Sequence, residues 1–290
     1  MKRLTEVWAA SNARFEALLA KRYAGHSEPQ EKLFEAMDYS LLAGGKRLRP
    51  FLVYQFCAAC GGRPEDADPA ALAIELIHTY SLIHDDLPAM DNDDYRRGHL
   101  TNHKVYGEAL AILAGDGLLT DAFSVLADAP LPADRIAACV RILSKYAGPW
   151  GMVGGQVLDI QSEERKLTEQ EVLDIQIRKT GALIRAACEM GVVCAGGSPE
   201  QRTAARCYAD GVGLAFQIRD DVLDVIGDAQ KLGKAVGVDA QKNTFVRLYG
   251  LEVCQKLIET QTGLACSELK CFENASMLRE IAAFLSKRDY

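Results

Sequence analysis

The sequence predicts an all-α protein, a single domain of ten or more helices around a central cavity. Apolar residues recur at helical spacings along almost the whole chain, and no segment shows the alternation typical of strands. The breaks between these segments are short glycine and proline turns rather than linkers. Because the composition does not shift along the chain, we expect residues 1–290 to form one domain.

The first helix is expected over residues 3–23, where Leu4, Trp8, Phe15 and Leu19 recur at helix-like spacings. The same periodicity predicts further helices over 30–43, 46–60, 68–87, 103–128, 133–147, 152–163, 168–195, 199–228, 242–270 and 274–287. The segments near 105–126 and 181–195 are apolar on most sides, which predicts burial in the bundle or against a partner.

Composition excludes several classes of protein. The net charge of -7 argues against a nucleic-acid binder, which usually carries a basic excess. The nine cysteines include one C-x-x-C, Cys57 and Cys60, which lies in an apolar run and is expected to be buried and reduced, as in a cytoplasmic protein. The charged N-terminus does not resemble a secretory signal, and we expect no membrane span because no apolar run approaches about 20 residues.

The first acidic cluster follows an apolar helical segment and reads His84-Asp85-Asp86-Leu87-Pro88-Ala89-Met90-Asp91. Three carboxylates this close repel one another unless a cation compensates them or the segment is simply a solvated helix end. Oxygen ligands of this kind suit magnesium, which keeps waters and accepts phosphate oxygens. We expect Pro88 to end or bend the helix, so that Asp91 reaches back from irregular backbone.

The second acidic cluster, Asp220-Asp221-Val222-Leu223-Asp224, lies within a helical segment. Residues four apart share a helix face, so Asp220 and Asp224 point the same way, and a shared metal would offset their repulsion. The two clusters predict facing walls with magnesium ions and a diphosphate between them.

Basic residues accompany both acidic clusters. Lys46 and Arg49 lie three apart in Gly44-Gly45-Lys46-Arg47-Leu48-Arg49-Pro50, at an expected helix start where anions bind well. Further candidates are Arg96 and Arg97, which follow the first cluster, Lys179 in Lys179-Thr180-Gly181, and Lys234 and Lys242 after the second cluster. Any one of them alone would be read as a solvated surface residue, but their grouping beside two metal-like motifs favours phosphate binding.

The motifs taken together resemble those of the trans-prenyl diphosphate synthases, in particular the bacterial farnesyl diphosphate synthases. The resemblance covers the whole chain in order: GGKRLRP at 44–50, HTYSLIHDDLPAMDNDDYRRG at 78–98, GMVGGQVLDI at 151–160, KTGALI at 179–184 and FQIRDDVLDV at 216–225. It implies the isoprenoid synthase type of helical fold, a homodimer and several magnesium ions per active site. The helix near 105–126 is the expected dimer surface.

The resemblance also implies roles for individual residues. Magnesium would be bound by Asp85, Asp86, Asp91, Asp220, Asp221 and Asp224. Isopentenyl diphosphate would be held by Lys46, Arg49, His78 and Arg97, and the allylic diphosphate by Arg96, Lys179, Lys234 and Lys242. Thr180 and Gln217 would lie near the developing allylic cation, while Gln156 and Asp159 resemble positions near the cavity. The tail Lys287-Arg288-Asp289-Tyr290 is basic enough to close over isopentenyl diphosphate.

The implied reaction is the condensation of isopentenyl diphosphate with dimethylallyl and then geranyl diphosphate to give farnesyl diphosphate. Product length would depend on Tyr80 and Ser81, which precede Asp85 by five and four residues on the same expected helix. In the family, an aromatic residue at the position of Tyr80 is associated with farnesyl-length products.

Several alternatives to this function remain open. The product could be geranyl or geranylgeranyl diphosphate. A class I terpene cyclase would not be expected to carry DDVLD or the pair Lys46 and Arg49, and a non-catalytic prenyltransferase subunit would typically have lost the aspartates. A helical scaffold protein would leave the clustered acids unexplained.

Overall fold

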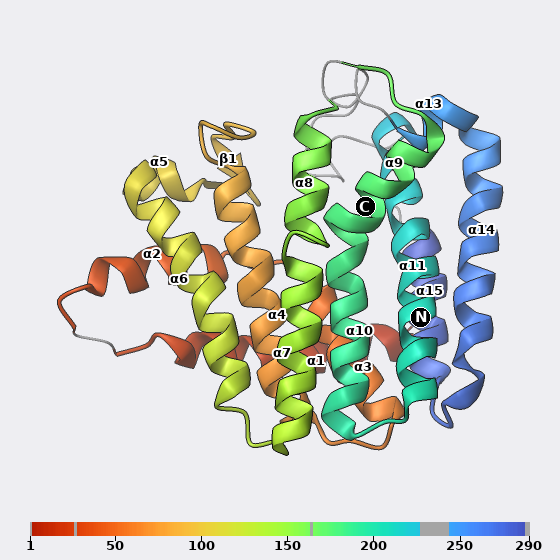
Figure 1. The fold of residues 1–290 in the computed structure, drawn as a ribbon, viewed down its shortest axis with the longest axis horizontal. Coiled ribbons are helices and arrows are strands. Elements are labelled where there is room, and N and C mark those ends of the chain that lie inside the picture. Colours follow the sequence, from red (N-terminus) through yellow and green to blue (C-terminus); the bar gives the residue numbers. More distant parts are fainter. Residues whose placement is uncertain (1, 26–27, 163–164, 227–243, 288–290) are drawn as a thin grey trace.

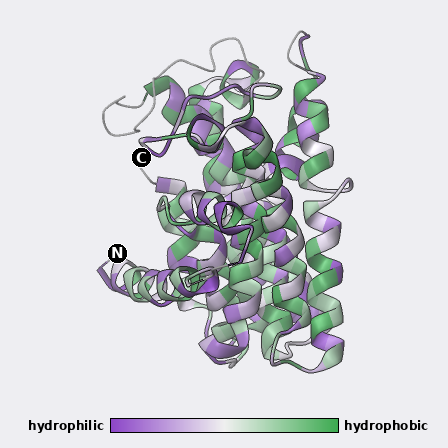
Figure 2. Ribbon diagram, turned by 90° about the vertical axis from the view of Figure 1, so that its left-hand side faces the viewer, coloured by the Kyte–Doolittle hydropathy of each residue, from purple (hydrophilic) through white to green (hydrophobic). Residues whose placement is uncertain are grey.

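Helices make up almost all of the regular structure in the computed structural model, in the segments where apolar residues recur at helical spacings (Figure 1). The structure describes residues 2–25, 28–162, 165–226 and 244–287. The all-α class predicted from the sequence is confirmed. Hydrophilic and hydrophobic residues alternate along the helices (Figure 2), as expected for amphipathic helices that share a core.

The N-terminal half holds six helices among its described residues. They are α1 (Lys2–Arg22), α2 (Glu31–Leu41), α3 (Leu48–Ala59), α4 (Pro64–Asp85), α5 (Asn102–Tyr106) and α6 (Glu108–Ala127). Two-residue strands β1 (Tyr95–Arg96) and β2 (His99–Leu100) pair antiparallel between α4 and α5. Helix α4 is central to this half because it packs against α3, α6 and α10.

The C-terminal half continues the bundle. It contains α7 (Ala133–Ala147), α8 (Met152–Ile160), α9 (Glu169–Gln176), α10 (Ala182–Ala195), α11 (Pro199–Ile226), α13 (Phe245–Tyr249), α14 (Leu251–Ser267) and α15 (Ser276–Lys287). A π-helical turn over Ile177–Gly181 joins α9 to α10, and a 3₁₀ turn over Glu268–Cys271 follows α14. Helices α11 and α14 pack side by side, and α10 lies between α3, α7 and α11.

Several boundaries differ from the expected ones for local reasons. The expected helix 103–128 is two helices, because Gly107 adopts φ 83° between α5 and α6. The described part of the expected helix 242–270 is likewise two helices, because Gly250 adopts φ 77° between α13 and α14. The expected helix 168–195 is interrupted by a π turn over Ile177–Gly181, which separates α9 from α10. Helix α4 begins at Pro64, earlier than expected, because proline suits the first helical position and the Asp66 carboxylate accepts from the Arg63 amide.

The core lies mainly between α3, α4, α10 and α11. Its largest fully buried side chains include Phe51, Phe56, Ile74, Ile77 and Tyr208. A second, smaller apolar cluster joins α9, α11, α13 and α14 around Val172, Ile218, Val222, Phe245 and Ile258. This second cluster supports the end of α11 that carries the second acidic motif.

Helix α6 departs from the expectation that no apolar segment approaches membrane-spanning length. In the described part of the chain it is long and apolar enough to cross a bilayer, judged by length and composition alone. Core helices of soluble proteins pass the same test, and α6 packs on α4 and α2. Its Asp121 accepts hydrogen bonds from Arg22 and Tyr23, so a carboxylate of α6 is engaged in the bundle.

The cysteines are dispersed through the helical bundle. All nine are free thiols, and Cys57 is buried while Cys60 is partly buried.

Candidate active site

The first acidic cluster lies at the C-terminal end of α4. Asp85 is the last residue of the helix, and the chain turns immediately after Asp86. The amide of Asp91 donates to the carbonyl of Asp85 at 2.9 Å, so the turn returns to the helix end as expected from Pro88. A helix C-terminus disfavours carboxylates, so nearby positive charge is needed at this point.

The Asp85 carboxyl is strongly affected by its surroundings. Its pKa is raised to about 6, mainly by burial and also by the nearby Asp91 and Asp86, against the opposite effect of Lys179 and Arg96. The basic groups therefore do not fully offset burial and like-charge repulsion. A cation close to Asp85 would favour its ionised form.

Asp86 makes a different set of contacts from Asp85. Its side chain is almost fully buried, and its Oδ1 accepts from Arg96 Nε at 2.6 Å and lies 2.5 Å from Nη2. Since Arg96 belongs to β1, this ion pair fixes the short hairpin onto the end of α4. Asp86 and Arg96 thus pair with each other, although the sequence suggested magnesium as the ligand of Asp86 and the allylic diphosphate as the ligand of Arg96.

The second acidic cluster occupies the C-terminal part of α11, and Asp220 and Asp224 lie four residues apart on it as expected. Asp224 is buried, and Asp221 accepts a hydrogen bond from the Phe245 amide at 2.7 Å. Figure 1 places the C-terminal ends of α4 and α11 at the same end of the bundle. The two acidic clusters therefore share one end of the molecule.

Lys179 lies in the π turn and belongs to the same region. Its Nζ lies 2.6 Å from Oδ2 of Asp159 on α8, and its charge acts on Asp85. Gly155 permits this arrangement, because a Cβ there would lie 2.3 Å from the Lys179 backbone nitrogen. π turns are frequent at functional sites, and this one places Lys179 near Asp85 at the end of α4.

A cavity of about 710 Å³ lies beside the acidic region, between α1, α3, α4, α11 and α15. All four residues predicted to hold isopentenyl diphosphate line it: Lys46, Arg49, His78 and Arg97. We call these four the basic cradle. The structure therefore brings together residues that are up to 51 positions apart in the sequence.

The cradle is strongly electropositive. Burial lowers the pKa of both Arg49 and Arg97, and Arg97 lowers the pKa of Arg49 further, while Arg47 and Arg96 lower the pKa of Arg97. Burial, together with Arg49 and Arg97, holds the pKa of His78 well below 6.5, so His78 is neutral at pH 7. An anion in this cavity would relieve the repulsion between the guanidinium groups.

Two charged residues of the cavity wall were missed by the sequence reasoning. Arg47 was treated as part of the motif without a role, but its side chain is fully buried and pairs with Glu75 at 2.7 Å. Glu75 is the one acidic residue among the described residues that line the cavity. A lone glutamate in the apolar run ALAIELIH, three residues before His78, was the available signal.

Tyr80 lies below the first acidic cluster on α4. It is 6% exposed, packs edge-on against His84 with 5.7 Å between ring centroids, and has its pKa raised to about 12 by burial and by Asp85. Ser81 is partly buried, and its hydroxyl donates to the His78 carbonyl at 2.9 Å. Tyr80 is therefore a buried ring in the electrostatic field of Asp85.

The remaining predicted residues divide into two groups. Thr180 and Gln217 lie on elements that pack together, the π turn and α11, and neither lines the 710 Å³ cavity. Gln156 lies on α8, one turn before Asp159. Lys234, Lys242 and the tail 288–290 lie outside the described residues.

The arrangement of the carboxylates bears on how they could hold magnesium. Within residues 2–25, 28–162, 165–226 and 244–287, no three His, Cys, Asp or Glu side chains converge closely enough to hold an ion unaided. Magnesium is usually bound through one or two carboxylates together with waters and substrate phosphates. Acidic clusters that provide a few oxygens each, beside groups able to bind phosphate, fit that mode of binding.

Comparison with known proteins agrees with this picture. The polyprenyl synthetase family profile matches residues 30–278. The farnesyl diphosphate synthase of Micrococcus luteus is 47% identical over 260 residues, covering 89% of this chain and 88% of that protein. The geranylgeranyl diphosphate synthase of Cyanophora paradoxa is 46% identical over 263 residues, covering 89% and 88%. An FPP/GFPP synthase from Zymomonas mobilis has a similar structure, with a TM-score of 0.88, 35% identity and coverage of 98% and 99%.

Proposed function

Because this chain belongs to the polyprenyl synthetase family, we propose that it is a magnesium-dependent farnesyl diphosphate synthase. It would condense isopentenyl diphosphate first with dimethylallyl diphosphate and then with geranyl diphosphate. The observation that carries the proposal is the separation of two anion sites. The basic cradle lines one cavity, whereas Lys179 and Arg96 lie beside the first acidic cluster.

We propose that each site binds one substrate. Isopentenyl diphosphate, which keeps its carbon–oxygen bond, would bind the cradle without metal. The allylic diphosphate, which loses pyrophosphate, would bind between the acidic clusters, where Lys179 stabilises charge on the leaving group. Lys234 and Lys242 are proposed to add further contacts there.

The reaction then proceeds in three steps. The allylic carbon–oxygen bond breaks and its electron pair leaves with pyrophosphate. The double bond of isopentenyl diphosphate attacks the resulting cation to form the new carbon–carbon bond, and a proton is lost from the intermediate to the released pyrophosphate. Thr180 and Gln217 would stabilise the cation, and the apolar walls of the site would exclude water.

Magnesium, when bound, would neutralise charge on the allylic diphosphate. Its proposed ligands are Asp85, Asp86 and Asp91 on one side and Asp220, Asp221 and Asp224 on the other. The raised pKa of Asp85 supports this proposal, because a carboxyl with that pKa lies in a site short of positive charge.

The farnesyl product is proposed over longer products because of Tyr80. Its buried ring lies five residues before Asp85 on α4, about 7.5 Å back along the helix axis, where it would limit chain growth. A geranylgeranyl product is the second candidate, favoured by the similarity to the Cyanophora paradoxa enzyme.

We also propose that the protein acts as a cytoplasmic homodimer. Ile112 and Leu113 on α6 are 44% and 55% exposed, which provides apolar surface on the helix expected to form the dimer contact. The free cysteines suit a reducing compartment. Light scattering would test the mass of the particle, and charged substitutions at Ile112 and Leu113 should yield monomers.

Product analysis tests the function directly. Purified protein is incubated with magnesium, isopentenyl diphosphate and each allylic primer in turn, and the chain length of the product is determined. Fifteen carbons are expected from both dimethylallyl and geranyl diphosphate. A twenty-carbon product would support the second candidate, whereas no condensation with any primer would favour a non-catalytic subunit.

A further inference from the structure

Arg47 lies between Lys46 and Arg49 in the sequence, but its side chain faces the protein interior rather than solvent. Its side chain is fully buried, although Lys46 beside it is exposed. The backbone at Arg47 adopts φ 50° and ψ 37°, a left-handed conformation that is uncommon for residues other than glycine. Such conformations persist where surrounding contacts determine them, so the contacts of Arg47 need an explanation.

All three guanidinium nitrogens of Arg47 donate to protein acceptors. Nε donates to Glu16 on α1 at 2.7 Å, Nη1 to Glu75 on α4 at 2.7 Å, and Nη2 to the Leu41 carbonyl at the end of α2 at 2.6 Å. Although Arg47 borders the cavity, these bonds direct its side chain into the protein. One residue therefore ties together three helices and the loop before α3.

The same loop is fixed at two further points. Trp8 on α1 donates from Nε1 to the Lys46 carbonyl at 2.9 Å, and its ring stacks on Phe51 at 4.5 Å between centroids. On the other side, Arg97 donates to the Gly44 carbonyl. The backbone that carries Lys46 is thus held by α1, and its start is held by a residue of the cradle itself.

Glu75 connects Arg47 to the arginines of the cradle. It is 2% exposed, lies one helical turn before His78 on α4, and its charge acts on Arg49 and Arg97 as well as Arg47. A displacement of Arg47 would therefore affect Lys46 through the loop, and Arg49 and Arg97 through Glu75.

We propose that Arg47 is a positioning residue, which holds the loop 44–49 so that Lys46 and Arg49 meet Arg97 and His78 around one diphosphate. The assignment of that diphosphate to isopentenyl diphosphate rests on the proposed function. The geometric part of the proposal concerns only how the cradle is assembled.

Two charge-conserving changes test this role. Arg47→Lys keeps the charge but cannot reach three acceptors in a planar fork. The double variant Arg47→Gln with Glu75→Gln removes one charge of each sign and leaves no lone buried ion. Because neither changes the net charge of the cavity wall, a loss of binding reports geometry rather than charge.

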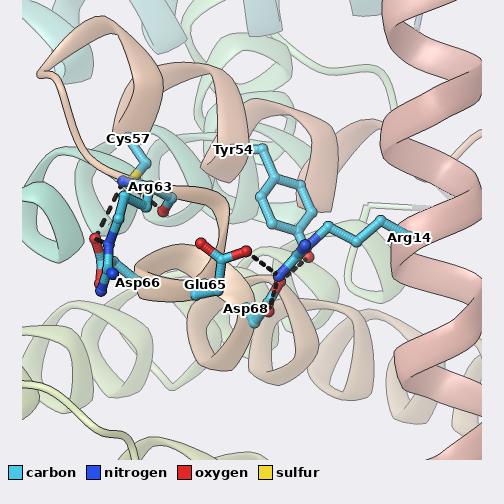
Figure 3. Close-up of polar contacts among 7 residues, drawn as sticks. All are labelled: Arg14, Tyr54, Cys57, Arg63, Glu65, Asp66 and Asp68. Carbon is cyan, nitrogen blue, oxygen red and sulfur yellow. Dashed lines mark hydrogen bonds and ion pairs between the residues drawn. The ribbon is translucent and has the colours of Figure 1, made fainter.

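Arg14, on α1, provides a matched control for Arg47, which contacts the same helix through Glu16. It also joins α1 to α4, through Asp68, with its Nη2 2.6 Å from Oδ2, and Tyr54 of α3 donates to the same carboxylate at 2.7 Å (Figure 3). The Arg14 cluster does not line the cavity. Arg14→Lys therefore weakens an arginine–carboxylate contact of the same kind between α1 and α4, at a site outside the cavity wall.

Binding and kinetics are measured on the full chain after circular dichroism has verified the fold. Calorimetry with inorganic pyrophosphate in EDTA should show affinity reduced about tenfold by Arg47→Lys and by the double variant, and unchanged by Arg14→Lys. With magnesium, the KM for isopentenyl diphosphate should rise about tenfold in the Arg47 variants, while the KM for geranyl diphosphate changes less than about twofold.

The two proposals fail in different ways. Equal effects of Arg47→Lys and Arg14→Lys, or unchanged pyrophosphate binding in a folded Arg47 variant, would overturn the positioning role. Wild-type protein that binds pyrophosphate but never condenses isopentenyl diphosphate would overturn the proposed function and leave the positioning role supported by calorimetry. If Arg47→Lys does not fold, the double variant decides the question.

Discussion

Gly155→Ala is the sharpest test of how the acidic region is assembled. A Cβ at this position would lie 2.3 Å from the Lys179 nitrogen and 2.7 Å from its Cα, and both of these atoms are backbone. An ordinary contact begins at 3.4 Å, so α8 and the π turn must separate by about 1 Å. The change moves Lys179 relative to Asp159 and Asp85.

The expected effect is larger on turnover than on stability. Overpacking of this kind costs about 1–3 kcal/mol, partly offset by the higher helix propensity of alanine, about 1 kcal/mol. A displacement of about 1 Å in a catalytic group can cost about 100-fold in rate, so kcat should fall between about 10-fold and 100-fold.

The assay compares Gly155→Ala with Gly263→Ala. Gly263 lies within α14, and a Cβ there would meet nothing within 4 Å, so this control should melt slightly higher and keep its activity. Turnover is measured with both substrates saturating and with folding followed by circular dichroism. Wild-type kcat and melting temperature in Gly155→Ala would refute the reasoning, because they would mean that α8 does not position Lys179.

Four further outcomes are expected. Asp85→Ala and Asp220→Ala should each slow turnover by at least about 100-fold with little change in circular dichroism, and near-normal turnover at saturating magnesium would remove that aspartate from the metal site. Arg49→Ala should raise the KM for isopentenyl diphosphate far more than that for the allylic substrate; the reverse would mean that the two sites are exchanged. Because the folded-state pKa of Asp85 is raised to about 6, its ionisation opposes folding. In EDTA, the ionisation of Asp85 should therefore lower the free energy of unfolding between about pH 4 and pH 7 by up to about 3 kcal/mol, so the difference in that free energy between Asp85→Asn and wild type should shift by this amount across the range. Tyr80→Ala should shift the product from fifteen to twenty carbons at a cost of about 3–5 kcal/mol in stability, measured on folded protein, and an unchanged product length would exclude Tyr80 as the limit.

The helical class could be predicted because its signal is local. Apolar spacing reports which face of a helix is buried, and glycine or proline punctuates it regardless of tertiary contacts. The π turn over Ile177–Gly181 could not be predicted in this way, because it is linked to the close approach of Gly155 on α8. The division at Gly107 was missed because one glycine inside an apolar periodic run does not show its φ.

The members of the cradle could be chosen from the sequence, but their supporting contacts could not. Lys46 and Arg49 stand out because two basic residues at a helix start suit an anion. Arg47 is also a basic residue of this motif, but its side chain binds Glu16 and Glu75 instead of facing the cavity. Its partners, Glu16 and Glu75, lie 31 and 28 residues away, so only the packing of α1 and α4 distinguishes it from its neighbours.

Neighbouring residues of the acidic motifs also differ in their contacts. In each, the second aspartate of the pair binds the segment that follows the helix: Asp86 pairs with Arg96 of the hairpin, and Asp221 accepts from the Phe245 amide at the start of α13. The first aspartate of the α4 pair, Asp85, instead has its pKa raised by burial and by neighbouring acids. Adjacent residues point to different sides of a helix, so the two carboxylates of a double aspartate need not have the same surroundings. Asp86 and Asp221 therefore hold the following segments in place, in addition to the metal-binding role proposed for both pairs.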